Sequence, residues 1–252
     1  MIELLIKVRY NLNMRRFLGN KINGDKIVLD GIEHNHLKNV LRLTVGEEVI
    51  VVIGDEYDYT CVIEKISKGD SVLRVVNKEI NNYNSHSDVT VFQALTKQDN
   101  MTLIVQKLTE LGVKTFVPFE RQFITSKDKF NKQEKLQTIS NQSIKQCKRS
   151  IPMNVSPTMS FNEMVKALSN YDVVVFANET ENAKSLSEVQ LNSNQKIAVI
   201  VGSEGGFSEA ECEKIINAGG SSVTLGKRIL RAETASIAVA SVVMYRIGEW
   251  DL

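Results

Sequence analysis

The pattern of hydrophobic positions divides the chain into two parts. Up to about residue 80, short runs rich in valine and isoleucine alternate with glycine, aspartate and lysine turns, which is typical of β-strands. The strand candidates are "KIVLD" (26–30), "EEVIVVIG" (47–54), "YDYTCVIEKI" (57–66) and "SVLRVVNKEI" (71–80). One short helix is expected at "EHNHLKNVLRL" (33–43). Closely spaced strands with a single helix predict a small β-barrel domain over residues 14–80.

Beyond a polar linker at 81–88, strands alternate with helices. The strand candidates are "VTVFQAL" (89–95), "KTFVPF" (114–119), "YDVVVFA" (171–177), "KIAVIV" (196–201) and "SSVTL" (221–225). Apolar residues recur at helical spacing between Met101 and Leu111, and Gly112 is placed to end that helix. This alternation predicts an α/β domain with a mostly parallel sheet over residues 89–252.

Two sequences of the form Ser-x-x-Glu mark further helix starts. They are Ser160 with Glu163 and Ser208 with Glu211. In this capping box the serine side chain and the glutamate side chain each bind a backbone N–H that the first turn leaves unpaired. Helices are therefore expected to begin directly after Ser160 and Ser208.

The strand at 196–201 runs into the glycine-rich turn Gly202-Ser203-Glu204-Gly205-Gly206. In an open α/β sheet, ligands bind at the carboxyl ends of the strands. The negative charge of Glu204 disfavours a phosphate, and neither nucleotide-binding glycine motif is present. A ligand that is neutral or positively charged and is bound by backbone groups fits this turn better. S-adenosylmethionine is one such ligand. A tight turn that binds nothing is the alternative.

A second glycine turn, Leu225-Gly226, leads through Arg228 and Arg231 into a helix dense in alanine, serine and valine. Glu233 and Thr234 fall in the first turn of that helix, where the helix dipole favours acids. We expect the strands that precede the two glycine turns to be neighbours in the sheet, so that both turns line one site.

Composition narrows the class of protein. The 252 residues are 42% hydrophobic and 24% charged, with a net charge of +1, as in an ordinary globular protein. No apolar run has the ~20 residues of a membrane span, and the first residues do not resemble a signal peptide. Cys61, Cys147 and Cys212 form no disulfide or zinc pattern, and His34 and His36 lack partners at ligand spacing. A cytoplasmic protein without a metal is expected.

Positive charge is concentrated in one segment. Residues 121–149 hold eight lysines and arginines against two acids. Such a segment in a nearly neutral protein is either an electrostatic contact for nucleic acid or a solvated helix face.

The motifs "VGSEGGFSEAE", "LGKRILRAETA", "VQKLTELGV" and "MRRF" together resemble the bacterial 16S rRNA uracil-N3 methyltransferases of the SPOUT superfamily. The resemblance covers Met14 to the C-terminus. It implies an N-terminal PUA-like barrel that binds RNA, and a C-terminal domain with a deep trefoil knot whose loops bind S-adenosylmethionine. It also implies a homodimer that acts on 16S rRNA or the 30S subunit. Residues 1–13 would then be an upstream extension.

The resemblance also implies roles for single residues. The cofactor-binding residues would be Gly202, Ser203, Glu204, Gly205, Gly206, Leu225, Gly226, Ile229, Leu230 and Ala235. Arg231 would stabilise the uracil anion, with Glu233 as a possible base and Thr234 beside them. Alternatively, Arg231 forms a structural ion pair, and Glu233 and Thr234 cap the helix.

The target base must leave its stack to be methylated, which requires phosphate contacts around it. The candidates are Arg15, Arg16, Lys38, Arg42, Lys145, Gln146, Lys148 and Arg149. Taken singly, each is more typical of a solvated surface charge.

The chain departs from the family pattern at two positions. Ser203 stands where the family usually has proline, which loosens the first glycine turn. Lys145 replaces a glutamate of the family's basic helix. Two alternative functions stay open: a SPOUT methyltransferase acting on another RNA position, and a ribosome assembly factor without catalysis.

Overall fold

The computed structural model describes residues 14–121, 132–179 and 184–251. The chain forms two compact units. Residues up to Asn84, together with Ile144–Ile151, form the first unit. Ser85–Ser143 and the chain from Pro152 onward form the second. The predicted extension at 1–13 lies outside the described residues.

The first unit is built on a six-stranded sheet with the order β1-β4-β5-β6-β3-β2. The strands are β1 (Arg16–Leu18), β2 (Ile22–Asn23), β3 (Lys26–Asp30), β4 (Glu48–Val52), β5 (Tyr57–Ile66) and β6 (Asp70–Ile80). β1 pairs with β4 in parallel, and the other pairs are antiparallel. All four predicted strands are confirmed, whereas the short β1 and β2 were not predicted. Two register shifts between β5 and β6 let these long strands bend.

The helix predicted at 33–43 is shorter and less regular than expected. It consists of α2 (Gly31–Asn35) and a π-helical turn, η1 (His36–Val40). Leu37 from this turn is buried in the core of the unit, beside Phe17 and Ile27. His34 is also buried, and its Nδ1 lies 2.8 Å from Ser71 Oγ. The centre of the His36 ring lies 5.8 Å from the centre of the Phe17 ring, so both histidines belong to the packing of this unit.

The second unit contains a seven-stranded sheet in which every strand pair is parallel. Its order is β10-β8-β7-β12-β11-β13, and β9 also pairs with β8. The strands are β7 (Asp88–Ala94), β8 (Thr115–Glu120), β9 (Asn154–Val155), β10 (Met159–Ser160), β11 (Val173–Ala177), β12 (Lys196–Val201) and β13 (Gly220–Val223). The helices are α3 (Gln98–Leu111), α4 (Gln133–Cys147), α5 (Phe161–Ala167), η2 (Leu168–Asn170), η3 (Leu186–Glu188), α6 (Glu209–Asn217) and α7 (Ala232–Arg246). The predicted α/β domain with a mostly parallel sheet is confirmed.

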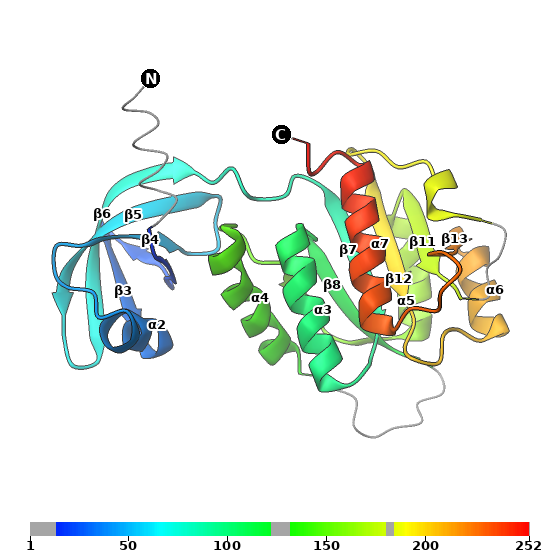
Figure 1. The fold of residues 1–252 in the computed structure, drawn as a ribbon, viewed down its shortest axis with the longest axis horizontal. Coiled ribbons are helices and arrows are strands. Elements are labelled where there is room, and N and C mark those ends of the chain that lie inside the picture. Colours follow the sequence, from blue (N-terminus) through cyan, green and yellow to red (C-terminus); the bar gives the residue numbers. More distant parts are fainter. Residues whose placement is uncertain (1–13, 122–131, 180–183, 252) are drawn as a thin grey trace. The chain divides into compact units, whose positions relative to one another are not determined.

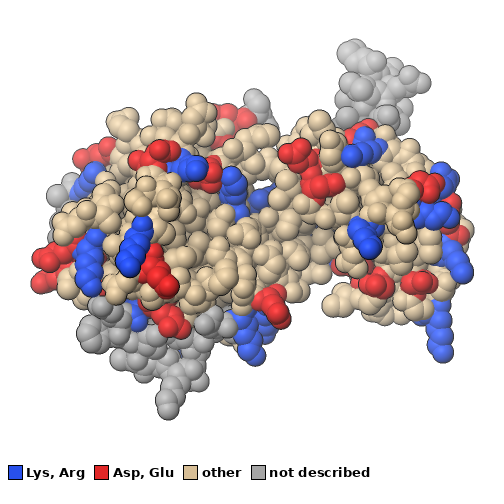
Figure 2. All heavy atoms as spheres, turned by 180° about the vertical axis from the view of Figure 1, so that it is seen from behind, with Lys and Arg blue, Asp and Glu red and all other residues tan. Residues whose placement is uncertain are grey.

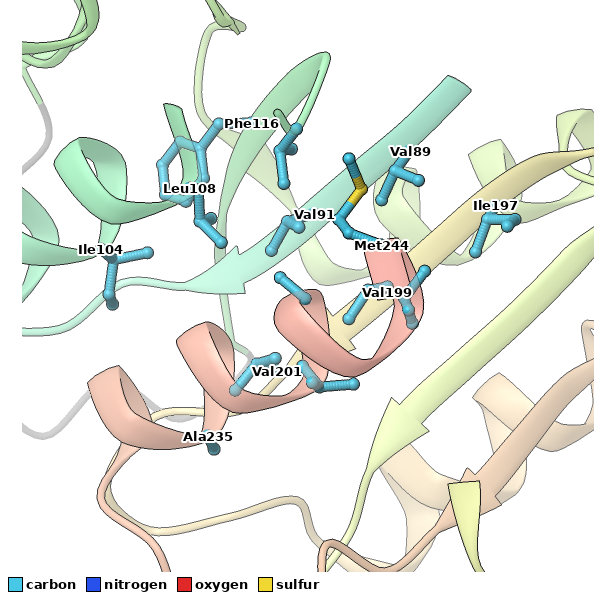
Figure 3. Close-up of a cluster of buried hydrophobic side chains, with 14 of the residues drawn as sticks. Val89, Val91, Ile104, Leu108, Phe116, Ile197, Val199, Val201, Ala235 and Met244 are labelled. Carbon is cyan, nitrogen blue, oxygen red and sulfur yellow. The ribbon is translucent and has the colours of Figure 1, made fainter. Parts of the chain in front are cut away.

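Helices cover both faces of this sheet (Figure 1). On one face, Val91 of β7 and Val199 of β12 pack against α3 and α7 in a large apolar cluster (Figure 3). On the other face, the alternate residues Phe92 and Ile200 pack with α5 and α6. Strands buried on both faces must be apolar at successive positions, which explains the continuous runs in the sequence.

The strands before the two glycine turns are not neighbours, and this prediction was wrong. β11 lies between β12 and β13 and pairs with both. The sequence shows where each strand ends but not the order in which strands pair. As a result, the residues that follow β11 lie between the two glycine turns.

Both predicted capping boxes are confirmed. In each, the serine accepts from the backbone N–H of the glutamate, and the glutamate accepts from the backbone N–H of the serine. A third box, Ser185 with Glu188, starts η3 and was not predicted. Gly112 ends α3 with φ 100°, as its position in the sequence indicated. No helix among the described residues is long and apolar enough to span a membrane.

Candidate functional site

A cavity of about 880 Å³ opens at the carboxyl ends of the strands in the second unit. Five stretches surround it: the residues after β7, Arg121 directly after β8, the residues after β11, the first glycine turn, and the second glycine turn with the start of α7. Its lining residues are Thr96, Lys97, Asn100, Arg121, Ala177, Asn178, Glu179, Val201–Phe207, Thr224–Glu233 and Ala235. All ten predicted cofactor-binding residues are among them.

The first glycine turn needs its glycines for two different reasons. Gly206 has φ 57°, and a Cβ there would meet Glu179 Oε1 at 2.7 Å. At Gly202, a Cβ would lie 3.3 Å from the backbone of Gly206 and from the Phe207 ring. The Gly206 N–H donates to the Ser203 carbonyl over 3.0 Å, which closes the turn. Among the described residues other than its chain neighbours, a Cβ built on Gly205 would meet only Arg121 Nη1, at 3.9 Å, so there is room beside this glycine.

Gln93 holds the base of this turn from the middle of the sheet. Its side chain is fully buried on β7, and its Nε2 donates to the Gly202 carbonyl over 3.0 Å. Its Oε1 accepts from the hydroxyl of Ser236 on α7. Gln93 was not among the predicted site residues, although an amide inside the apolar run "VTVFQAL" is the signal that could have identified it.

Arg121 lies at the rim of the cavity and binds Glu211 through two parallel hydrogen bonds. The Nε–Oε1 distance is 3.1 Å and the Nη2–Oε2 distance is 2.6 Å. Burial favours a raised pKa for the Glu211 carboxyl, but hydrogen bonds from Arg121 and Ser208 outweigh it and lower the pKa. Glu211 is thus ionised and neutralises Arg121. Arg121 was counted in the basic segment but was not predicted to be in the site.

The second glycine turn brings Arg231 to the cavity. Gly226 has φ 108°, and Thr224 Oγ1 lies 3.2 Å from its nitrogen. Arg231 is the N-cap of α7, with its side chain exposed, and it forms no ion pair with any described residue. Glu233 is half-buried and lines the cavity, whereas Thr234 is exposed and is not part of the lining. The structural ion pair considered for Arg231 is therefore absent among the described residues.

The cavity presents both signs of charge. Glu179, Glu204 and Glu233 contribute carboxylates, and Asn100 Nδ2 lies 3.5 Å from Glu204 Oε1. The basic residues of the lining are Lys227, Arg228 and Arg231 from the second glycine turn, together with Lys97 and Arg121. Such an arrangement suits a ligand with a cationic centre beside an anionic or polarised partner. No group of three described His, Cys, Asp or Glu residues is placed to hold a metal ion.

All eight predicted RNA-binding residues lie in the first unit, because Ile144–Ile151 groups with it. Arg15, Arg42 and Gln146 are exposed. Lys38 Nζ donates to the Ser67 carbonyl over 2.7 Å, and Lys148 Nζ lies 5.4 Å from the centre of the Tyr83 ring.

The other three have partners or are buried. Arg16 makes two hydrogen bonds to Asp58, at 2.8 and 2.7 Å, and its side chain is 8% exposed. Lys145 pairs with Glu33 at 2.7 Å, and Arg149 is buried. On the face drawn in Figure 2, the described basic and acidic side chains are interspersed. RNA contacts from the exposed members stay a prediction, and Lys127 and Lys129 of the basic segment lie outside the described residues.

Comparison with known proteins identifies the family. A family model described as an RNA methyltransferase domain matches residues 83–244. The chain belongs to this RNA methyltransferase family. A second family model, the RNA methyltransferase PUA domain, matches residues 29–76 in the first unit.

The sequences and structures of several known proteins match this RNA methyltransferase over most of its length. It is 29% identical to the ribosomal RNA small subunit methyltransferase E of Bacillus subtilis, over 86% of this chain and 89% of that protein. It is 30% identical to the Aquifex aeolicus protein of the same name, over 92% and 99%. The structure of the Neisseria gonorrhoeae ribosomal RNA small subunit methyltransferase E bound to S-adenosylmethionine matches with a TM-score of 0.80 and 25% identity, over 92% and 98%. A Legionella pneumophila protein in complex with the same cofactor matches with a TM-score of 0.85, 25% identity and the same coverage.

Proposed function

We propose that this RNA methyltransferase transfers a methyl group from S-adenosylmethionine to N3 of one uracil in the 16S rRNA of the small ribosomal subunit. The observation that carries the proposal is the meeting of both glycine turns and Arg231 around one cavity. The names of the relatives and the cofactor bound to two similar structures support it.

The residues of the cavity fit this cofactor. Its volume of about 880 Å³ lies within the range of small-molecule sites, ~300–1,000 Å³. The backbone of Gly202–Gly206 and Gly226 can approach a ligand closely because no side chain intervenes. Leu225, Ile229, Leu230 and Ala235 offer apolar surface for an adenine ring, and Glu204 suits a cationic centre. When bound, S-adenosylmethionine supplies a methyl group activated by its sulfonium.

Arg231 and Glu233 supply the remaining chemistry in this proposal. Uracil N3 carries a proton at neutral pH, and the anion left after its loss places charge on the two carbonyl oxygens. The Arg231 guanidinium, exposed and not held by another described residue, can stabilise that charge. The Glu233 carboxylate can accept the N3 proton. Thr234 is exposed beside them and outside the cavity lining, so it fits a role at the start of the helix better than a catalytic one.

The first unit is proposed to hold the RNA. Its exposed basic residues Arg15 and Arg42, with Lys148, can contact phosphates on either side of the target base. The proposed domains are an RNA-binding domain at 14–80, a linker at 81–88 and a methyltransferase domain at 89–252. The methyltransferase domain is proposed to contain a deep trefoil knot, and the protein is proposed to act in the cytoplasm.

A homodimer is proposed from an apolar surface on the second unit. Val242 and Tyr245 of α7, Trp250 after it, and Leu103 of α3 are exposed. Helices α3 and α7 pack against each other, so these side chains belong to one layer of the unit. Exposed aromatic residues gathered in this way are typical of protein interfaces.

Methylation by the purified protein tests the function. The protein is incubated with S-adenosylmethionine and either free 16S rRNA or 30S subunits from cells that lack it, and the RNA is digested and analysed by mass spectrometry. We expect one 3-methyluridine per 16S rRNA, at a position that is unmodified in those cells. A methyl group on a ribose or on another base would favour the alternative methyltransferase activity. Absence of S-adenosylmethionine binding at micromolar concentrations would favour an assembly factor.

A further inference from the structure

The first glycine turn lacks the proline that would make it rigid. It contains three glycines in five residues, and Ser203 stands at its second position. A free chain of this composition loses much conformational entropy when a ligand orders it. The turn must therefore be ordered by contacts with its surroundings if it is to bind a ligand well.

Ser203 is tied to Arg121 through its side chain. The Arg121 Nη1 donates to the Ser203 hydroxyl over 3.2 Å. The same nitrogen is the nearest atom to a Cβ built on Gly205, at 3.9 Å, so the guanidinium lies beside the middle of the turn. Arg121, which lies outside the turn, thus restrains Ser203, the position at which a proline ring would restrain the turn directly.

Arg121 is itself held in place. The Glu211 carboxylate accepts hydrogen bonds from its other two guanidinium nitrogens. Both partners are buried, since 13% of the Arg121 side chain and 3% of the Glu211 side chain are exposed. Glu211 in turn accepts from the Ser208 N–H over 2.9 Å, as part of the capping box of α6. The guanidinium carbon also lies 5.8 Å from the centre of the Phe207 ring. The chain of contacts therefore runs from α6 through Glu211 and Arg121 to Ser203.

We propose that Arg121 is a positioning residue for S-adenosylmethionine binding, and that it fixes the first glycine turn through the Ser203 hydroxyl in place of a proline. This inference rests on the proposed function, which assigns the cofactor to this cavity. Because Glu211 neutralises Arg121, the guanidinium can lie at the rim of the site with its charge compensated.

Ser203→Ala tests the proposal most directly, because it removes one acceptor and leaves the Arg121–Glu211 pair intact. We expect calorimetry on the full-length protein to show about tenfold weaker S-adenosylmethionine binding, the effect of one lost charge-assisted hydrogen bond, with an unchanged melting temperature. Arg121→Lys should weaken binding similarly, because lysine cannot contact Glu211 and Ser203 as a planar fork does. The double variant should bind S-adenosylmethionine no more weakly than either single variant, because both substitutions remove the same Arg121–Ser203 hydrogen bond.

Ser203→Pro tests whether a proline makes the contact from Arg121 unnecessary. In this variant the ring restrains the turn, so adding Arg121→Lys should no longer weaken cofactor binding. Ser160→Ala is the matched control, because it removes the hydroxyl that caps α5, which lies outside the cavity lining and outside the contacts that hold Arg121. It should lower the melting temperature and leave cofactor affinity within about twofold of the wild type, as the loss of one N-cap affects helix stability.

Hydrogen exchange of the Gly206 amide, measured without any ligand, separates this inference from the proposed function. Faster exchange in Ser203→Ala and Arg121→Lys than in the wild type is the expected result. Equal protection in all three proteins, or wild-type cofactor affinity in Ser203→Ala, would overturn the positioning role. A wild-type protein that does not bind S-adenosylmethionine contradicts the proposed function and the role in cofactor binding, and the exchange rates then decide whether Arg121 orders the turn.

Discussion

Arg231 contributes its backbone to helix α7 and leaves its side chain for the cavity. Its backbone is extended, with φ −64° and ψ 155°, and its carbonyl accepts from the Ala235 N–H over 2.8 Å. Neither feature depends on the guanidinium. A substitution at this position therefore tests chemistry with little effect on the fold.

We expect Arg231→Ala to lower the single-turnover methylation rate by roughly 10²- to 10³-fold, the effect of removing one preorganised donor. Cofactor affinity and the melting temperature should change little, because no described residue pairs with this side chain. Arg231→Lys should restore the rate only in part, since a point charge replaces a planar donor. Single-turnover methylation of 30S subunits, with thermal denaturation of each variant, measures both effects.

Arg228→Ala provides the comparison, because Arg228 is an exposed arginine of the same turn. It should reduce the rate much less than Arg231→Ala. If Arg231→Ala lowered the melting temperature and the folded variant methylated at the normal rate, Arg231 would be structural and the assignment to catalysis would be lost.

At the scale of single residues, the sequence predicts those site residues that follow one another directly along the chain. Glycines at the end of an apolar strand are visible in one stretch, and all of those predicted line the cavity. Gln93 and Arg121 were missed because their partners lie far along the chain, at Gly202 and Glu211. Their environments depend on which strands become neighbours, and no local pattern records that.

Helix α4 shows the same limit at the scale of elements. Its sequence indicates a basic helix, yet its last residues belong to the first unit, where Ile144 packs with Ile50 and Val52 of β4. An amphipathic pattern shows which face is buried but not against which partner. The departure at Lys145 is explained only by this packing, since the amine pairs with Glu33 of α2 at 2.7 Å.

Reversing the charge at Lys145 should destabilise the first unit. Lys145→Glu places two carboxylates together in a site where the paired side chains are 17% and 11% exposed. We expect a loss of roughly 3 kcal/mol in the free energy of unfolding, the lower end of the cost of breaking a buried pair. Urea denaturation followed by circular dichroism measures it.

The double variant Lys145→Glu with Glu33→Lys is the control, because it restores opposite charges. It should recover most of the lost stability. If both variants were as stable as the wild type, the pair would be a solvated contact. A stable single variant would also show that the glutamate of the family pattern is tolerated here without a compensating change.

At the scale of the whole molecule, the α/β domain was predictable because parallel strands buried on both faces leave long apolar runs. The strand order was not, and placing β11 between β12 and β13 adds Ala177, Asn178 and Glu179 to the cavity. The predicted residues also separate by unit. Those proposed for the cofactor lie in the second unit, and those proposed for RNA lie in the first.

The proposed dimer is tested on the exposed surface of α7. Tyr245 is 63% exposed and Trp250 46% exposed, with ring centres 6.4 Å apart. A stable interface buries ~800 Å² per partner around such apolar anchors. We expect Val242→Asp with Tyr245→Glu to shift the protein to the 28.3 kDa mass of one chain in sedimentation equilibrium, because two unpaired charges would face each other across the interface. The wild type should have about twice that mass.

Ile216→Asp is the matched control for this experiment. Ile216 lies on α6, on the opposite face of the sheet, and is 50% exposed. A charge there should leave the dimer intact, because it adds the same carboxylate away from α7. A dimeric Val242→Asp, Tyr245→Glu variant would exclude the α7 surface as the interface, and a monomeric wild type would exclude the dimer itself. Dissociation by Ile216→Asp instead would move the interface to the α6 face, where it would lie beside the capping box that holds Glu211 and Arg121.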